Sequence, residues 1–240
     1  MASPLKMFST FGTFNPAVPG HSRPQPLRRL ALLAGGAVLA LAAAQVPAQT
    51  LASASTGDVA PDAMAKSVTE EVMKALRTDK DIAAGNQKKL TDLVETKILP
   101  FFDFSQMTQL AMGRNWREAT PDQRKAVTAE FRTLLVRTYT TALSTYKNQN
   151  VEYKPVKLAP GDSRVTVRSS IIQDGGPPIS MDLRMEKQPG GWKVYDVAIE
   201  NISLLENWRG QFNTQIQKNG VDGLIKALAD LNSKSRGTQS

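Results

Sequence analysis

Three stretches in the second half of the chain decide its fold: they read RVTVRSSII at residues 164–172, ISMDLRME at 179–186 and WKVYDVAIE at 192–200. In each stretch apolar residues alternate with polar ones, which is the period of a strand with one buried face. The connecting sequences, DGGPP at 174–178 and PGG at 189–191, are rich in residues that form tight turns. Strands joined by such short connections predict an antiparallel sheet with one apolar face.

The alternation assigns the apolar strand residues to a single face of this sheet. Tyr195 is expected on the same face, whereas Asp196 is expected on the opposite, wetter face, in a structural role. A further strand is expected at 151–158, and because Pro155 interrupts it, it belongs at an edge of the sheet. The eight residues assigned to the apolar face are Val165, Val167, Ile171, Met181, Leu183, Met185, Val197 and Ile199.

Helical spacing precedes the sheet, over residues 62–148. The clearest helix start is Thr120-Pro121-Asp122-Gln123, because Thr can cap, Pro fits the first turn and Gln can complete a capping box. This long helix is expected to reach about Lys147. Its apolar stripe includes Phe131 and Leu135, and simple core packing explains such a stripe as well as ligand contact does.

Two more helices are expected after the sheet, over residues 202–232, with Asn219-Gly220 ending the first of them. The order along the chain is therefore helices, sheet and helices. This order predicts an α+β fold in which helices cover one face of a curved antiparallel sheet.

The N-terminus has the pattern of a secretory signal peptide. Arg28-Arg29 precede an apolar run over residues 30–44, and Gln45-Val46-Pro47-Ala48 follows, with small residues at the positions that a signal peptidase reads. A membrane anchor is the rival interpretation, but a span needs about 20 apolar residues and this run is shorter. The predicted divisions are a cleaved signal peptide at 1–48, a flexible linker at 49–61, one folded domain at 62–232 and a tail at 233–240.

The composition excludes several classes of function. The leader holds four of the 30 basic residues and no acidic one, so its removal takes the formal net charge from +8 to +4, which does not indicate nucleic-acid binding. The chain has no cysteine, and its one histidine, His21, lies in the leader. A mature protein without either residue cannot use a Ser-His-Asp triad, a thiolate or a histidine metal site.

Two classes of function remain open on these grounds besides a binding protein. One is a cone-shaped α+β enzyme that uses Asp196 or a tyrosine on a small apolar substrate. The other is a structural adaptor of the cell envelope with a solid core. A closed cavity with a buried carboxylate would favour the enzyme, and a close-packed interior would favour the adaptor.

Several motifs, taken in order, resemble the bacterial MlaC family, also called the toluene-tolerance auxiliary family. The resemblance covers essentially the whole chain after the leader, and the ordered set is more specific than any single run. The matching runs are Ile98-Leu99-Pro100-Phe101-Phe102-Asp103-Phe104, Met112-Gly113-Arg114-Asn115-Trp116, Ala119-Thr120-Pro121-Asp122-Gln123, Trp192-Lys193-Val194-Tyr195-Asp196-Val197, Asn201-Ile202-Ser203-Leu204, Asn207-Trp208-Arg209-Gly210-Gln211-Phe212 and Asn219-Gly220-Val221-Asp222-Gly223-Leu224-Ile225.

The resemblance implies a lipid-binding domain in which a sheet of nuclear-transport-factor-like type and a helical part enclose an apolar lipid cavity. Helices at 62–148, the sheet at 151–200 and helices at 202–232 would form it. Phospholipid acyl chains would contact the eight strand residues, with Phe131 and Leu135 as second choices. Because the headgroup can remain in water, headgroup selectivity is expected to be weak.

The same resemblance implies a function between two membranes. The protein would be a periplasmic phospholipid carrier that shuttles glycerophospholipid between the outer and inner membranes and maintains outer-membrane lipid asymmetry. The implied partners are an outer-membrane lipoprotein–porin complex and an inner-membrane ABC transporter complex with an MCE-domain protein. That transporter would supply the energy, so neither enzymatic activity nor a cofactor is implied.

Overall fold

The structure is a computed structural model that describes residues 59–143, 149–173 and 175–237, all within the compact unit Ala52–Ser240. The predicted signal peptide, and the linker as far as residue 58, lie outside the described residues. Within the described ranges, no helix has both the length and the hydrophobicity needed to cross a bilayer.

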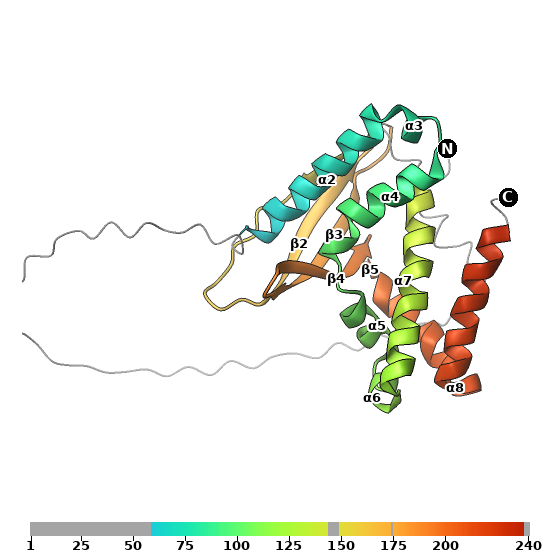
Figure 1. Ribbon diagram of the computed structural model, residues 1–240. Coiled ribbons are helices and arrows are strands. Elements are labelled where there is room, and N and C mark those ends of the chain that lie inside the picture. The colour runs from blue at the N-terminus through green and yellow to red at the C-terminus, as the bar shows by residue number, and fades with distance from the viewer. Residues whose placement is uncertain (1–58, 144–148, 174, 238–240) are drawn as a thin grey trace, which may run out of the picture. The chain divides into compact units, whose positions relative to one another are not determined.

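Five antiparallel strands form one sheet in the order β1-β2-β3-β4-β5 (Figure 1). The antiparallel sheet predicted from the alternation is therefore confirmed. The first strand ends before Pro155 and lies at an edge, as expected. The last one, only two residues long, was not predicted. The strands are β1 (Asn150–Tyr153), β2 (Arg164–Ile172), β3 (Ile179–Gln188), β4 (Gly191–Ile199) and β5 (Ile202–Ser203).

Helices precede and follow the sheet, which confirms the α+β class. The long α8 is broken at Gly220, where φ is 68° and ψ is −176°, so the expected stop between two helices is present. This helix begins two residues after the expected start and extends to Gly237, beyond the expected end at 232. The helical elements are α2 (Pro61–Thr78), α3 (Lys80–Ala83), α4 (Gln87–Lys97), η1 (Leu99–Phe101), α5 (Phe104–Met112), α6 (Asn115–Glu118), α7 (Pro121–Leu143) and α8 (Leu204–Gly237).

A capping box fixes the start of α7. The Gln123 N–H donates to Thr120 Oγ1 over 3.2 Å, and the Thr120 N–H donates to Gln123 Oε1 over 3.0 Å. Two backbone donors without partners inside the helix are thereby satisfied. The helix start predicted from Thr120-Pro121-Asp122-Gln123 is confirmed.

We expect Thr120→Ala to lower the free energy of unfolding by about 1 kcal/mol, because the cap on the Gln123 N–H is lost. Urea denaturation of the purified protein measures this difference. Thr133→Ala is the control, because the Thr133 hydroxyl is exposed and donates only to Ala129 within α7. Equal stability of both variants and the wild type would show that the cap contributes nothing.

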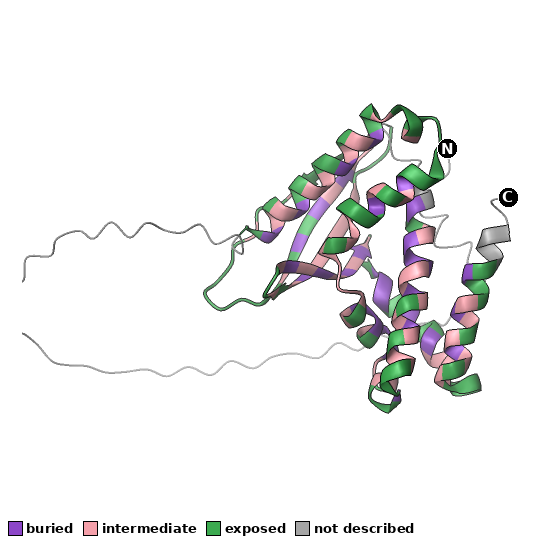
Figure 2. Cartoon of the chain, viewed as in Figure 1, coloured by how far each residue is buried: buried purple, intermediate pink, exposed green. Residues whose placement is uncertain are grey.

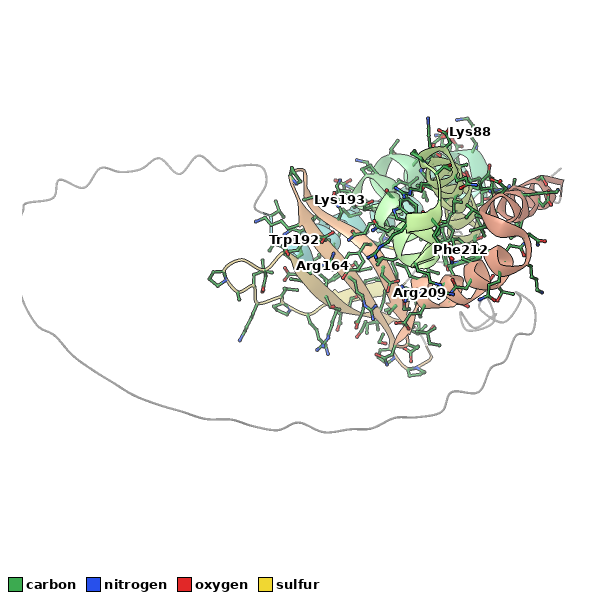
Figure 3. The ribbon with its side chains drawn as sticks, turned by 90° about the horizontal axis from the view of Figure 1, so that it is seen from below. Lys88, Arg164, Trp192, Lys193, Arg209 and Phe212 are labelled. Atoms are coloured by element: carbon green, nitrogen blue, oxygen red, sulfur yellow. The ribbon has the colours of Figure 1, made fainter. Side chains whose placement is uncertain are left out.

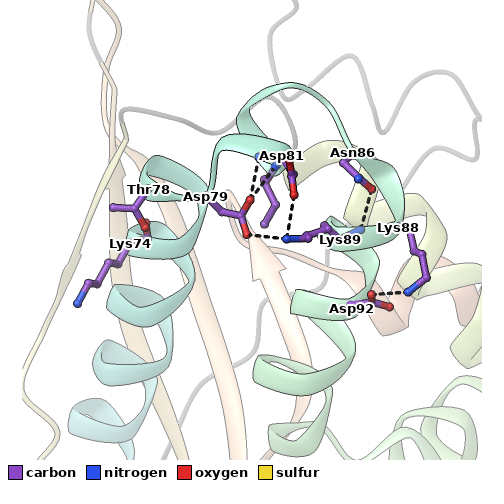
Figure 4. A network of polar contacts seen from close by, with 9 residues as sticks. Lys74, Thr78, Asp79, Asp81, Asn86, Lys88, Lys89 and Asp92 are labelled. Carbon is purple, nitrogen blue, oxygen red and sulfur yellow. Dashed lines mark hydrogen bonds and ion pairs between the residues drawn. The ribbon is translucent and has the colours of Figure 1, made fainter.

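The turn from α2 through α3 into α4 is held by exposed polar groups (Figure 4). Asp79 caps α3 by accepting the N–H groups of Asp81 and Ile82, and Lys89 of α4 reaches Asp81 at 2.9 Å. The N–H of Ile82 is the main cause that lowers the pKa of the Asp79 carboxyl. Asn86, the predicted cap of α4, accepts the Lys89 N–H over 3.1 Å. This corner fixes how α4 returns beside α2.

The apolar interior falls into three clusters. The bundle core joins α5, α7 and α8, as the close pairing of α7 and α8 in Figure 1 suggests. The hairpin cluster lies between α2 and α4 around Val72, Leu76 and Leu90. The sheet cluster lies under α2 around Ala65, Val167, Met185, Trp192 and Val194. The sheet thus has its own apolar face, separate from the packed core of the helical bundle.

Candidate functional site

Strand register places the eight predicted strand residues on one face of the sheet, which we call the inner face. Val165 lies opposite Met185 across β2 and β3, and Ile171 lies opposite Ile179. The remaining pairs are Val167 with Leu183, Leu183 with Val197 and Met181 with Ile199. Directly opposed residues of antiparallel strands share a face, so the structure brings these eight side chains together.

The inner face is only partly filled. Val167 and Met185 are fully buried and Ile171 is 9% exposed, and the buried positions of β2 alternate along the strand (Figure 2). The other five strand residues, Val165, Met181, Leu183, Val197 and Ile199, keep intermediate exposure. Helix α2 packs on this face through Met64 and Ala65. Helix α2 therefore covers only part of the inner face and leaves apolar side chains accessible beside the part that it covers.

Phe131 and Leu135 lie elsewhere, in the bundle core. The Phe131 ring packs edge-on against Trp208, with centroids 5.5 Å apart, and against Phe212 at 5.0 Å. Figure 3 shows Trp192 on the sheet and Phe212 in the helical part. An apolar stripe predicts which side of a helix is buried but not which element packs against it. The sequence therefore could not show that Phe131 and Leu135 lie apart from the eight strand residues.

A β-bulge in β4 corrects one assignment made from the alternation. Met185 pairs with Val194, whereas Arg184 pairs with Asp196, so the register shifts between these two pairs. The shift places Val194 on the inner face with Val197, and Tyr195 leaves it. Tyr195 instead lies beside Arg164, whose guanidinium is 5.7 Å from the ring centroid. The expectation that Tyr195 shares the apolar face is wrong, and Val194 was missed.

Phe102 is a second residue of the sheet cluster that the alternation did not reveal. It forms an isolated parallel bridge with Val194, and the following Asp103 N–H donates to the Val194 carbonyl over 2.9 Å. Asp103 also caps α5 by accepting the Gln106 N–H, as predicted. The Phe101-Phe102 pair before a cap was the available signal, but it does not say which element the rings contact.

Asp196 is buried, and the expectation of a wetter position is wrong. It is 1% exposed because β5 and the start of α8 cover it. Its carboxylate accepts from Ser203 Oγ at 2.7 Å and from the Leu205 N–H at 3.2 Å, and Arg184 Nη1 lies 3.1 Å away. Negative charge is favourable at a helix N-terminus, so this group holds α8 to the sheet, which is the structural role expected of it.

An open cleft of about 530 Å³, which we call the α2–β1 cleft, lies between α2 and the edge strand β1. The Thr69 hydroxyl and the Tyr153 hydroxyl are 2.7 Å apart. Burial raises the pKa of Tyr153, and the Thr69 contact opposes this. The cleft is lined by Lys66, Thr69, Glu70, Met73, Arg77, Gln149, Asn150, Val151, Glu152 and Tyr153.

A smaller open cleft, about 110 Å³, lies between the sheet and α8 and includes Arg184, Asp196 and Arg209. Both clefts contain charged side chains. The part of the chain that the structure describes does not show the enclosed apolar cavity expected from the resemblance. It also holds no group of His, Cys, Asp or Glu side chains suited to a metal ion.

Comparison with known proteins gives concordant matches. A family model described as MlaC protein matches residues 66–230. The intermembrane phospholipid transport system binding protein MlaC of Haemophilus influenzae is 25% identical over 178 residues, which cover 71% of this chain and 81% of that protein. The toluene tolerance protein ttg2D of Pseudomonas putida is 27% identical over 194 residues, which cover 80% and 86%.

One solved structure is more similar in sequence. It is a phospholipid-binding protein from Ralstonia solanacearum in complex with a phospholipid, with 41% sequence identity and a TM-score of 0.68. The match covers 73% of this chain and 98% of that chain. The fold of this chain therefore recurs in a protein that holds a phospholipid.

Proposed function

Because the chain belongs to the MlaC family, we propose that it is an exported phospholipid carrier that shuttles glycerophospholipid between the outer and inner membranes. Removal of the leader at 1–48 would release it into the periplasm. Through this shuttling it would maintain the lipid asymmetry of the outer membrane. The observation that carries this proposal is the phospholipid bound by the Ralstonia solanacearum protein, which is 41% identical in sequence to this chain.

The inner face supplies a physical basis for binding acyl chains. Each buried CH₂ group contributes roughly 0.8 kcal/mol, so transferring an acyl chain of about 16 carbons through water costs on the order of 10 kcal/mol. The accessible part of the inner face, at Met181, Leu183, Val197 and Ile199, is apolar and lies beside the packed end of the sheet. We propose that acyl chains occupy the space over these residues.

The carrier itself needs no energy source or catalytic group in this scheme. An inner-membrane ABC transporter complex with an MCE-domain protein would drive transfer at one membrane, and an outer-membrane lipoprotein–porin complex would exchange lipid at the other. The relatives are named for binding and transport. Asp196, the candidate base of the enzyme alternative, already uses both carboxylate oxygens in bonds that hold α8. We therefore assign the protein no enzymatic activity.

A transfer assay tests this function. The purified chain is added to donor vesicles that carry a fluorescent phospholipid and to acceptor vesicles without it. We expect the transfer rate to rise in proportion to protein concentration, because a carrier moves lipid through water in its bound form. Mass spectrometry of the lipid afterwards should find it chemically unchanged. A rate that does not depend on the protein, or conversion of the lipid into products, would contradict the proposal.

A further inference from the structure

The connection between β1 and β2, residues 154–163, projects from one end of the sheet beside the start of α2 (Figure 1). We call it the β1–β2 loop, and almost all of it is exposed (green in Figure 2). Its backbone is nevertheless fixed. The Val156 N–H donates to Asp62 of α2 over 3.1 Å, the Val156 side chain packs against the sheet cluster, and the Lys187 N–H of β3 donates to the Ser163 carbonyl over 2.8 Å.

A tight turn at the tip of the loop holds an apolar side chain out in water. The Asp162 N–H donates to the Ala159 carbonyl over 3.1 Å, and the Ala159 N–H donates to Asp162 Oδ2 over 2.8 Å. Pro160 and Gly161 occupy the two central positions, and the φ of Gly161 is 90°, a value that favours glycine. Leu158 directly precedes this turn and is 43% exposed. The loop therefore presents Leu158 in a defined place.

The exposed charges around Leu158 are mostly basic. Among the described residues of the loop and of the adjoining strand ends, Asp162 is the one exposed acid, and Glu186 is largely covered and pairs with Arg164 at 2.7 Å. Neither lysine of the loop makes an ion pair with a residue that the structure describes. The exposed basic side chains here are Lys154, Lys157, Arg164 and Lys187.

An anionic lipid surface is the partner that matches this combination. It offers an apolar layer directly beneath a layer of phosphates, so a leucine can enter the first while neighbouring lysines reach the second. Val59, which precedes α2 at the same end of the sheet, is 57% exposed and adds a second apolar side chain. An acidic protein surface would account for the lysines but not for the two exposed apolar residues beside them.

We propose that the β1–β2 loop docks the protein onto an anionic lipid surface, with Leu158 in the apolar layer and Lys154 and Lys157 at the phosphates. This inference goes beyond the carrier function, because it concerns the surface that the protein approaches and not the lipid that it carries. Met181, near the start of β3, and Ile199, at the end of β4, lie at the opposite end of the sheet. Docking therefore leaves the accessible part of the inner face uncovered.

The test is flotation with vesicles of phosphatidylcholine alone and of phosphatidylcholine mixed with equimolar phosphatidylglycerol. The protein is purified from the exported fraction, without the proposed signal peptide. At low ionic strength we expect the wild type to bind the mixed vesicles roughly tenfold more strongly than the neutral ones, and high salt should remove the difference. Lys154→Gln and Lys157→Gln should each weaken binding to the mixed vesicles about fivefold. Leu158→Ser should weaken it roughly three- to tenfold.

Matched controls separate docking by the loop from general attraction by a basic protein. A double variant with Lys125→Gln and Lys218→Gln removes two exposed charges from the helical bundle, and Leu231→Ser removes an exposed leucine from α8. Both should bind the mixed vesicles like the wild type. The lipid that co-purifies should not change in any of these variants, because each position lies outside the inner face.

Three outcomes would overturn the inference. They are a wild type that binds both kinds of vesicle equally, bundle variants that lose as much binding as the loop variants, and binding to polyglutamate without binding to vesicles, which would assign the loop to an acidic protein. The carrier function is judged separately, because it fails if the wild type holds no phospholipid and stands if lipid is held whatever the vesicles show.

Discussion

Replacing Phe131 by alanine is expected to lower the free energy of unfolding by about 4 kcal/mol, because truncating a buried aromatic ring removes its burial energy and leaves a cavity. For a domain of this size, the melting temperature should fall by roughly 10 °C. The large effect follows from where the Phe131 ring lies. Phe131 is fully buried and contacts both Trp208 and Phe212 edge-on within the bundle core. Calorimetry or urea denaturation measures the loss.

The same variant decides whether Phe131 packs the core or contacts lipid. If it only packs the core, the loss of stability should be equal in the lipid-free and the lipid-bound protein. Lys125→Ala, at an exposed position of the same helix, should change stability by less than about 0.5 kcal/mol. A loss that occurs only in the lipid-bound protein would place Phe131 at the ligand and contradict the packing seen in the structure.

The sequence correctly predicted the features that depend only on residues close together in the chain. The alternation in β2 and β3 follows from the opposite orientation of successive side chains, and so it located Val167 and Met185 correctly on one face. The capping box at Thr120 and the break at Gly220 depend on neighbouring residues alone. Each of these predictions needed only a few consecutive residues, which is why the structure confirms them.

Features that depend on distant partners were not predictable in the same way. The bulge at Tyr195 and Asp196 lies where distant elements, β5 and the start of α8, supply the hydrogen-bond partners of the Asp196 carboxylate. Strict alternation therefore failed in β4 although it held in β2. Likewise, the stripe that contains Phe131 gives no information on whether the sheet or α8 lies opposite. The shape of the space over the inner face depends on how α2 lies across the sheet, which no sequence period encodes.

A carboxylate on the inner face should remove the bound lipid. Leu183→Asp places an acid among the apolar side chains of the face, where an ionised group without a partner is disfavoured by several kcal/mol. Acyl chains cannot pair with it, so the amount of lipid that co-purifies should fall by more than about tenfold. Leu183 suits this test because it keeps intermediate exposure and lies opposite both Val167 and Val197.

Two further variants keep this expectation open to disproof. Thr166→Asp introduces the same charge at an exposed position on the opposite face of the sheet, where it lies opposite Arg184, and lipid content should not change. Met181→Asp alters the inner face at a side chain of intermediate exposure near its less packed end, so it serves if Leu183→Asp does not fold. Circular dichroism must show native secondary structure in each variant before its lipid content is interpreted.

The most direct measurement of the central claim is the molar ratio of phospholipid to protein after purification without detergent, determined by mass spectrometry of extracted lipid. We predict that the wild type and Thr166→Asp carry phospholipid in comparable amounts, and that folded Leu183→Asp carries almost none. A wild-type protein without phospholipid, or a folded Leu183→Asp protein that retains the wild-type amount, would contradict the assignment of the inner face as the surface that holds acyl chains.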